Sequence, residues 1–312
     1  MTLAILCSGQ GQQGASMFAL TGAAPEAAAL FNQATKQLGG RDPREIVRRS
    51  SSEALHHNRI GQILCTLQAL AATSALRPAM PPRLVVAGYS VGELAAWGVA
   101  GVMGMTDTLA LSAQRAEAMD AAAPSGDGLL FLRGLSRQSI ERLCRHHDAA
   151  VAIVEPGGAF ILGGNRVSFE ALAEEAKASS ASRVVEIPVE VASHTPRLAA
   201  ASPVFRDRLR QVSLTFPPPA GTRLLSGIDG SSVVDGELGL DKLAAQISQT
   251  VQWADCLQAC VEAGATAFLE LGPGAALSSM AAGTYRDVVA RSLDDFRTLD
   301  GVRAWLAKIA AR

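Results

Sequence analysis

Residues 84–97 read LVVAGYSVGELAAW. The stretch passes from an apolar run at 84–87, through the pentapeptide Gly88–Gly92, into a run of helix-forming residues. A G-x-S-x-G sequence between a strand and a helix is typical of a nucleophile elbow, a sharp turn that holds a serine hydroxyl clear of the backbone. Ser90 is therefore a candidate nucleophile for acyl transfer, and the alternative is a turn built from small residues without chemistry.

Apolar runs like the one before Gly88 alternate with alanine-rich stretches along the chain. Strands are predicted at 3–7, 84–87, 223–226 and 266–271, and helices at 24–39, 60–76, 106–121, 240–250 and 253–263. This alternation predicts an α/β protein, in which helices cover both faces of a parallel sheet. With an elbow at the end of one strand, we expect an α/β-hydrolase-like core.

A different rhythm interrupts this pattern between residues 128 and 189. The predicted order there is strand 129–133, helix 137–147, hairpin 150–154 with 159–162, helix 168–178 and strand 183–188. The order β-α-β-β-α-β is that of the ferredoxin-like motif. We therefore expect a large subdomain, residues 1–125 and 192–312, and an inserted ferredoxin-like small subdomain, residues 126–191, with a substrate cleft between them.

The composition narrows the class of partner. The 312-residue chain has a formal net charge of −1 and no long Lys/Arg cluster, so neither nucleic acid nor an anionic membrane is the expected partner. No run of 18 apolar residues is present, and no membrane span is expected. The five cysteines are odd in number and scattered, which predicts reduced thiols, a cytoplasmic location and no structural metal.

A serine needs a base to take its proton. Four of the five histidines occur as adjacent pairs on probable helices, at 56–57 and 146–147, where a solvated role is expected. His194 stands alone after the last strand of the predicted insertion, at the junction of the two subdomains. It is the preferred base, and the alternative is a loop histidine with an ordinary backbone hydrogen bond.

The segment Ser8–Gly14 follows the first predicted strand and is rich in glycine and glutamine. It lacks the G-x-x-x-x-G-K-[ST] pattern of a phosphate-binding loop. Glycine also allows a backbone N–H to approach a reacting carbonyl. We therefore expect the N–H of Gln10, together with that of Val91 after the nucleophile, to form an oxyanion hole.

Taken together, these motifs resemble the malonyl-CoA:acyl carrier protein transacylases and the acyltransferase domains of fatty acid and polyketide synthases. The resemblance covers about residues 3–290. Beside the elbow Gly88–Glu93, the matching positions are Gly9–Gln13 for G-Q-G-x-Q, Arg115 in a helix 25 residues after the serine, Ser193-His194, Gln246 seven residues before Trp253, and Gly272–Gly274 for G-P-G.

The resemblance implies a substrate and roles for these positions. Arg115 would hold the free carboxylate of a malonyl group, since a guanidinium binds carboxylates with paired, charge-assisted hydrogen bonds. The main-chain carbonyl of Gln246 would orient His194, and Val91 and Ser193 would line the acyl pocket and bear on the choice between malonyl and methylmalonyl. The substrates would be malonyl-CoA and an acyl carrier protein, with no bound cofactor. For Arg115 alone, the alternative is a solvated helix arginine paired with Glu117 or Asp120.

Two positions depart from the family pattern. Cys7-Ser8 replaces the usual Phe-Pro, and Tyr89 stands where histidine is usual. A tyrosine in the elbow is also similar to the transacylase subunit of bacterial malonate decarboxylase. Two other functions stay open, a serine hydrolase or thioesterase acting on acyl-CoA and a non-catalytic subunit that docks a carrier protein. The sequence leaves the carrier protein and the oligomeric state open.

Overall fold

The computed structural model describes residues 1–311, and one of its two five-stranded sheets is entirely parallel. Its five strands lie in the order β10-β9-β1-β2-β7. Their bounds are Thr2–Cys7 (β1), Leu84–Gly88 (β2), Thr222–Leu224 (β7), Ala265–Glu270 (β9) and Val289–Ser292 (β10). The central strand β1 is buried along Leu3–Cys7, as expected for a parallel sheet covered on both faces.

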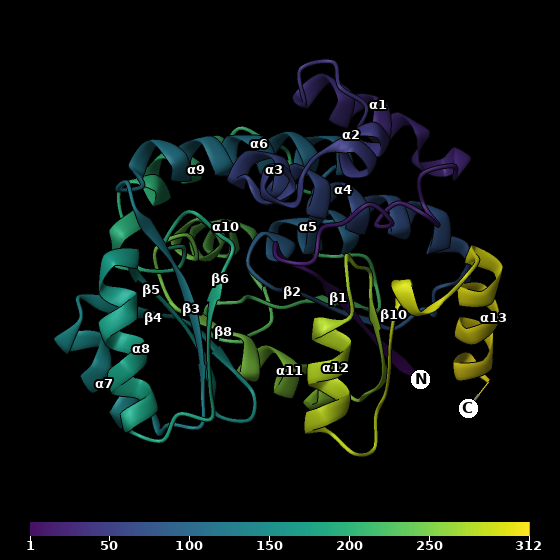
Figure 1. Ribbon diagram of the computed structural model, residues 1–312. Coiled ribbons are helices and arrows are strands. Elements are labelled where there is room, and N and C mark those ends of the chain that lie inside the picture. Colours follow the sequence, from purple (N-terminus) through teal and green to yellow (C-terminus); the bar gives the residue numbers. More distant parts are fainter. Residues whose placement is uncertain (312) are drawn as a thin grey trace.

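Helices cover this sheet on both sides, with α4, α5 and α6 on one side and α11 and α12 on the other (Figure 1). The α-helices outside the second sheet are α1 (Ala28–Gln37), α2 (Pro43–Arg49), α3 (Ser52–His56), α4 (Asn58–Leu76), α5 (Val91–Val99), α6 (Met105–Ala122), α9 (Ala201–Leu209), α10 (Gly236–Ala245), α11 (Trp253–Glu262), α12 (Ala276–Thr284) and α13 (Leu299–Ala310). Short 3₁₀ turns lie at Pro25–Ala27, Arg77–Ala79, Arg166–Ser168, Pro196–Leu198 and Leu293–Asp295. None of the described helices is long and apolar enough to cross a membrane.

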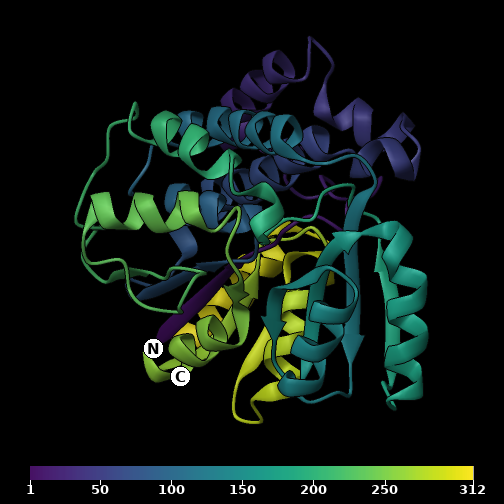
Figure 2. The same cartoon turned by 90° about the vertical axis from the view of Figure 1, so that its left-hand side faces the viewer.

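The second sheet lies beside the first and has the order β6-β3-β5-β4-β8. Its strands are β3 (Asp127–Arg133), β4 (Ala149–Glu155), β5 (Ala159–Asn165), β6 (Arg183–Ile187) and β8 (Val251–Gln252). Helices α7 (Arg137–His146) and α8 (Phe169–Ala178) cover one face, where a separate apolar core forms. We call residues 127–187 the small lobe and the other described residues the large lobe; Figure 2 shows the two side by side.

The lobes are tied together at several points. Strand β8 of the large lobe pairs in parallel with β4 of the small lobe. At the start of β3, the buried carboxylate of Asp127 accepts a hydrogen bond from Arg197 Nε at 2.7 Å, just after the chain has returned to the large lobe. Because Arg197 also reaches Asp148 at 3.0 Å, it links the large lobe to two points of the small lobe.

The predicted helices and strands lie close to the observed ones, except for two predictions between residues 223 and 250. The six elements of the small lobe and the strands at 3–7, 84–87 and 266–271 lie where they were predicted. The predicted helix 240–250 is wrong at both ends: α10 begins at Gly236, after Asp235 caps it by accepting from Leu238 N, and ends at Ala245. The strand predicted at 223–226 is the shorter β7; Leu225 N still donates to Val86 O of β2, and a turn begins at Gly227.

Candidate active site

Ser90 lies at a strained turn between β2 and α5. Its φ of 57° is in the left-handed region, which a residue with a side chain rarely adopts. The flanking glycines are required by space: a Cβ on Gly92 would lie 2.0 Å from the carbonyl oxygen of Cys7, and one on Gly88 would lie 2.1 Å from Gly92. The turn therefore has the form of a nucleophile elbow, which presents the Ser90 hydroxyl in front of the sheet.

His194 connects Ser90 to the main chain of Gln246. Its Nε2 lies 2.8 Å from Ser90 Oγ, and its Nδ1 lies 2.6 Å from the carbonyl oxygen of Gln246. A carbonyl oxygen only accepts, so Nδ1 carries the proton and Nε2 is free to accept from the serine hydroxyl. The chain from Ser90 through His194 to Gln246 O is the geometry of a nucleophile, a base and an orienting group.

The surroundings keep His194 neutral. Burial, and then the positive charge of Arg115, lower the pKa of His194 to about 3. A neutral imidazole can take a proton from Ser90 at every pH at which the protein would ordinarily be studied.

Arg115 is fully buried, which excludes the solvated alternative. Its Nη1 donates to Gln62 Oε1 at 2.8 Å and its Nη2 donates to Gln246 Oε1 at 3.0 Å. Within residues 1–311 its Nε has no hydrogen-bond partner, and neither of these amide partners carries a charge. Burial lowers the pKa of Arg115 to about 10, so the group is still a cation at neutral pH. Arg115 is a buried cation without a directly bonded carboxylate.

The side chain of Gln246 forms hydrogen bonds to Arg115, Ser90 and Glu93, contacts that the sequence did not predict. Its Nε2 donates to the carbonyl oxygen of Ser90 at 3.0 Å and to the carboxylate of Glu93. Burial raises the pKa of Glu93 to about 7. Glu93 was visible only as the last residue of the elbow motif, and Gln62 only as one polar residue of a predicted helix, so neither was singled out.

The predicted oxyanion donors are the N–H groups of Gln10 and Val91. Val91 is the first residue of α5, where an N–H has no partner inside its own helix. No other acceptor within residues 1–311 takes a hydrogen bond from either N–H group. The loop that carries Gln10 is anchored by Ser8, whose hydroxyl donates to the buried Glu270 at 2.8 Å.

The same loop has glycines at 9, 11 and 14, which is the spacing of the dinucleotide-binding pattern G-x-G-x-x-G. That pattern works by opening a helix toward a pyrophosphate. Here residues 15–23 form turns and the first helical residues are Pro25–Ala27. The loop therefore lacks the helix that a dinucleotide site of this kind needs.

Two connected hollows lead to Ser90. An inner cavity of about 70 Å³ contains Ser90, His194 and Ser193 and has an aliphatic wall from Leu129 and Ile153 of the small lobe. An outer cavity of about 450 Å³ lies between the lobes. Gln10, Tyr89, Ile161 and Ile187 line both. Val91 and Arg115 are both buried, and neither is among the residues that line these hollows.

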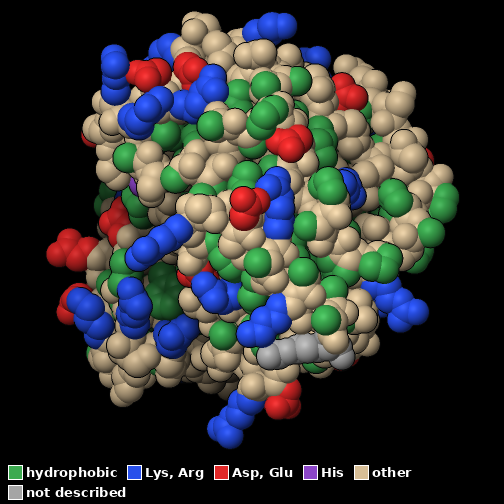
Figure 3. Space-filling view, turned by 90° about the vertical axis from the view of Figure 1, so that its right-hand side faces the viewer, with side chains coloured by type: hydrophobic (Ala, Val, Ile, Leu, Met, Phe, Trp, Pro, Cys, Tyr) green, Lys and Arg blue, Asp and Glu red, His purple; other side chains and the backbone are tan. Residues whose placement is uncertain are grey.

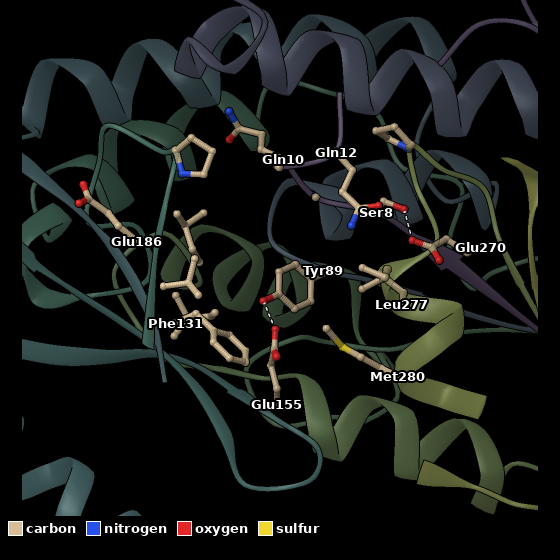
Figure 4. Close-up of a pocket in the computed structure, with 18 of the residues that line it drawn as sticks. Ser8, Gln10, Gln12, Tyr89, Phe131, Glu155, Glu186, Glu270, Leu277 and Met280 are labelled. Atoms are coloured by element: carbon tan, nitrogen blue, oxygen red, sulfur yellow. Dashed lines mark hydrogen bonds between the residues drawn. The ribbon is translucent and has the colours of Figure 1, made fainter. Parts of the chain in front are cut away.

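Tyr89 stands at the neck between the two cavities. Its hydroxyl donates to Glu155 of the small lobe at 2.7 Å (Figure 4), and its ring packs edge-on against Trp253, with the ring centroids 5.4 Å apart. These two contacts fix the ring next to Ser90. The elbow residue that departs from the family pattern is thus bound to a carboxylate 66 positions along the chain.

This arrangement can perform nucleophilic acyl chemistry on a serine hydroxyl. No group of three or more His, Cys, Asp or Glu side chains suited to a metal ion occurs in the described part of the chain. The profile of the family described as the acyl transferase domain matches residues 5–299. The chain therefore belongs to this acyl transferase family.

Individual proteins related to this family are similar to this chain over nearly their whole length. The malonyl CoA-acyl carrier protein transacylase of Mycobacterium tuberculosis (strain ATCC 25618 / H37Rv) is 30% identical over 306 residues, covering 96% of this chain and 98% of that protein. The crystal structure of MCAT from M. tuberculosis has a TM-score of 0.88 at 28% identity, with 98% and 100% coverage. The crystal structure of an acyl-carrier-protein S-malonyltransferase from Burkholderia pseudomallei 1710b has a TM-score of 0.88 at 25% sequence identity. The match covers 97% of this chain and 100% of that one.

Proposed function

We propose that the protein is a malonyl-CoA:acyl carrier protein S-malonyltransferase. The observation that carries the substrate class is Arg115, a buried guanidinium whose hydrogen-bond partners among the described residues, Gln62, Gln246 and the Met119 thioether, are all uncharged. The carboxylate of a malonyl group supplies a negative charge, and an acetyl group does not. The similarity to malonyl transacylases along the whole chain supports the same assignment.

In the first half-reaction, Ser90 Oγ attacks the thioester carbonyl of malonyl-CoA while His194 Nε2 takes the hydroxyl proton. The oxyanion forms against the N–H groups of Gln10 and Val91. When the tetrahedral intermediate collapses, the carbon–sulfur bond breaks and CoA leaves with the proton from His194. The product is a malonyl ester of Ser90.

In the second half-reaction, the thiol at the end of a carrier protein's pantetheine arm attacks this ester. His194 takes the thiol proton and returns it to Ser90 as the ester bond breaks. The carbonyl of Gln246 holds the His194 tautomer throughout, in the role that a carboxylate has in a triad. The acyl group thus passes between two thiols, and neither half-reaction uses a resident cofactor or metal.

We further infer the finer fold class. The small-lobe order β6-β3-β5-β4, with the chain order β-α-β-β-α-β, supports a ferredoxin-like subdomain of residues 126–191. The parallel sheet with an elbow after β2 supports an α/β-hydrolase-like core of residues 1–125 and 192–312. The five free cysteines of the chain are all buried, which suits a reducing, cytoplasmic location.

The test is to mix the protein with malonyl-CoA and measure intact mass before and after adding a carrier protein or free pantetheine. We expect a malonyl adduct that Ser90→Ala lacks and that the added thiol discharges as a malonyl thioester. Release of free malonate with neither adduct nor thioester would contradict transfer and favour the thioesterase alternative. No reaction of any kind would favour the docking subunit.

The role of Arg115 is tested separately by comparing malonyl-CoA with acetyl-CoA as donors. We expect Arg115→Ala to lose about tenfold or more of the preference for malonyl, because a charge-assisted hydrogen bond is lost. Arg49→Ala, which removes an exposed arginine paired only with Glu45, is the control and should keep the preference. Unchanged discrimination in Arg115→Ala would contradict the carboxylate assignment.

A further inference from the structure

One face of the small-lobe sheet carries a stripe of opposed side chains. Strands β3 and β6 run antiparallel, and alternate residues of each strand point to the same face. Three opposed pairs share this face: Leu129 with Ile187, Phe131 with Val185, and Arg133 with Arg183. The other face, with Leu130 and Leu132, belongs to the core under α7 and α8.

The side chains of this stripe change from apolar to basic with increasing distance from Ser90. Leu129 and Ile187 line the inner cavity beside Ser90. Phe131, Val185 and Arg183 line the outer cavity. From Leu129 to Arg133 the strand rises about 13 Å. The stripe is therefore an apolar path that starts at the nucleophile and ends at two cations.

These two arginines have no acidic partner. Within residues 1–311, neither Arg133 nor Arg183 makes an ion pair. Both guanidinium carbons lie 5.6 Å from the centroid of the Phe131 ring. Like charges directly opposite each other on paired strands are destabilising. An anion bound between them would offset that repulsion and accept hydrogen bonds from both planar groups.

The carboxylates of the outer cavity are engaged elsewhere. Glu186 is paired with Arg166 at 2.9 Å and lies across the cavity from Tyr89 (Figure 4), and Glu270 accepts from Ser8 and Ser278. Glu155 accepts from Tyr89. Burial raises the pKa of Glu155, and the Tyr89 hydroxyl and then the charge of Arg133 partly offset this rise. None of the three neutralises the arginine pair through direct contact.

The surface agrees with this charge pattern. Figure 3 views the molecule from the side on which α12 lies, and α12 supplies Leu277 and Met280 to the outer cavity. On this side Lys and Arg side chains surround a hollow with a hydrophobic floor (Figure 3). The lining of the outer cavity itself is largely apolar and includes Arg183.

We propose that Arg133 and Arg183 bind the phosphate at the end of a pantetheine arm. The proposal rests on the proposed function, since the thioester at the other end of the arm must reach Ser90. The arm lies along Phe131 and Val185, and the phosphate sits between the two guanidinium groups. CoA and the arm of a carrier protein share this phosphate, so one site serves both half-reactions.

The test compares malonyl-phosphopantetheine with malonyl-pantetheine, which lacks the phosphate, as donors to Ser90. We expect kcat/KM for malonyl-enzyme formation to be at least about tenfold higher for the phosphorylated donor, because charge-assisted bonds to phosphate are strong. In the double variant Arg133→Gln, Arg183→Gln this ratio falls close to one. The control Arg142→Gln, Arg145→Gln removes two exposed charges from α7, on the opposite face of the sheet, and keeps the ratio.

The sources of the phosphate are separated by extending the series to malonyl-CoA as donor and to a phosphopantetheinylated carrier protein as acceptor. If the double variant loses reaction rate with malonyl-phosphopantetheine, with malonyl-CoA and with the carrier protein alike, the result supports the phosphate site. A loss with malonyl-CoA alone would mean that the arginines bind the nucleotide, and it would overturn the proposal. A preference that survives in the double variant would overturn it as well.

Failure of the proposed function would be recognised independently. If no malonyl adduct forms with any donor, the malonyltransferase assignment fails. Calorimetric titration with the unacylated thiols, phosphopantetheine and pantetheine, then still decides the arginine site. Tighter binding of phosphopantetheine that the double variant loses supports it, and equal binding of the two thiols to the unsubstituted protein overturns it.

Discussion

His194 is the residue whose behaviour depends most on where it is buried. In water an imidazole has a pKa near 6.5. Here burial, and then the charge of Arg115, lower the pKa to about 3. The deprotonated form is the one that acts as a base, so the shift extends the active form toward acid.

This gives a prediction for the pH dependence of the first half-reaction. We expect kcat/KM for malonyl-enzyme formation to show no loss centred near pH 6.5, whereas a histidine of ordinary pKa would lose about thirtyfold by pH 5. Rapid-quench measurements of the adduct between pH 5 and 8 check this. Arg115→Gln removes one cause of the shift and should move the acid limb to higher pH. An acid limb near pH 6.5 in the unsubstituted protein would contradict the prediction.

Single residues differed in how far the sequence could place them. Ser90 and His194 were paired from a motif and an inventory, because a nucleophile restricts its base to a few residue types. Glu93, Gln62 and Glu155 were not assigned a role. Their partners lie 53 or more positions away, and only the folded chain brings them together.

At the scale of elements, the elbow depends on a close approach between the start of α5 and the end of β1. Gly92, the second residue of α5, lies directly against the carbonyl of Cys7 at the end of β1. Gly283 in α12 is the opposite case, since nothing lies within 4 Å of the Cβ that alanine would add. The two positions offer a matched pair of glycine-to-alanine substitutions.

We expect Gly92→Ala to lower the unfolding free energy by about 1–3 kcal/mol, because the added methyl group forces the main chain apart. Malonyl-enzyme formation should fall by about a hundredfold or more, since a shift of about 1 Å misplaces Ser90. Gly283→Ala should leave the rate unchanged and stabilise α12 by about 0.5–1 kcal/mol. Urea unfolding and adduct formation measure both. A fully active Gly92→Ala protein would contradict this account of the elbow.

The sequence pattern predicted most of the longer elements but not α9, α12 or the 12-residue α13, and it missed the short strands β8 and β10. The six elements of the small lobe were predicted in the right order and close to their observed bounds, because they alternate with glycine-rich or polar turns. Strand β8 has only two residues and β10 only four, and both depend on pairing with a neighbouring strand. The end of α10 was misplaced because the chain must turn at Gln246 to aim its carbonyl at His194, a requirement of the fold rather than of local sequence.

At the scale of the whole molecule, the site exists only where the two lobes meet. The large lobe supplies Ser90, His194 and Arg115, and the small lobe supplies the wall of the inner cavity. The hydrogen bond from Tyr89, the residue before Ser90, to Glu155 joins the two lobes, and Glu155 is only 5% exposed. Removal of this hydrogen bond should therefore affect both the stability of the interface and the shape of the cavity.

Tyr89→Phe deletes the hydroxyl and leaves the Glu155 carboxylate without its donor. Burial already raises the pKa of Glu155, and the Tyr89 hydrogen bond offsets part of that rise, so the variant should raise this pKa further. Above the unfolded-state pKa near 4.5 the unfolded chain ionises Glu155 freely, whereas the folded variant holds its proton to higher pH because the folded-state pKa is raised. We expect the free energy of unfolding in urea to fall by about 1–3 kcal/mol at pH 8. The loss should be smaller at pH 4, because there the carboxyl is mostly protonated in both the folded and the unfolded state. Tyr285→Phe, the control at the other tyrosine of the chain, loses only an exposed 3.2 Å contact with Gln258 and should change stability by less than about 0.5 kcal/mol. A loss in Tyr89→Phe that is the same at both pH values would show that the hydroxyl stabilises the interface without acting through Glu155.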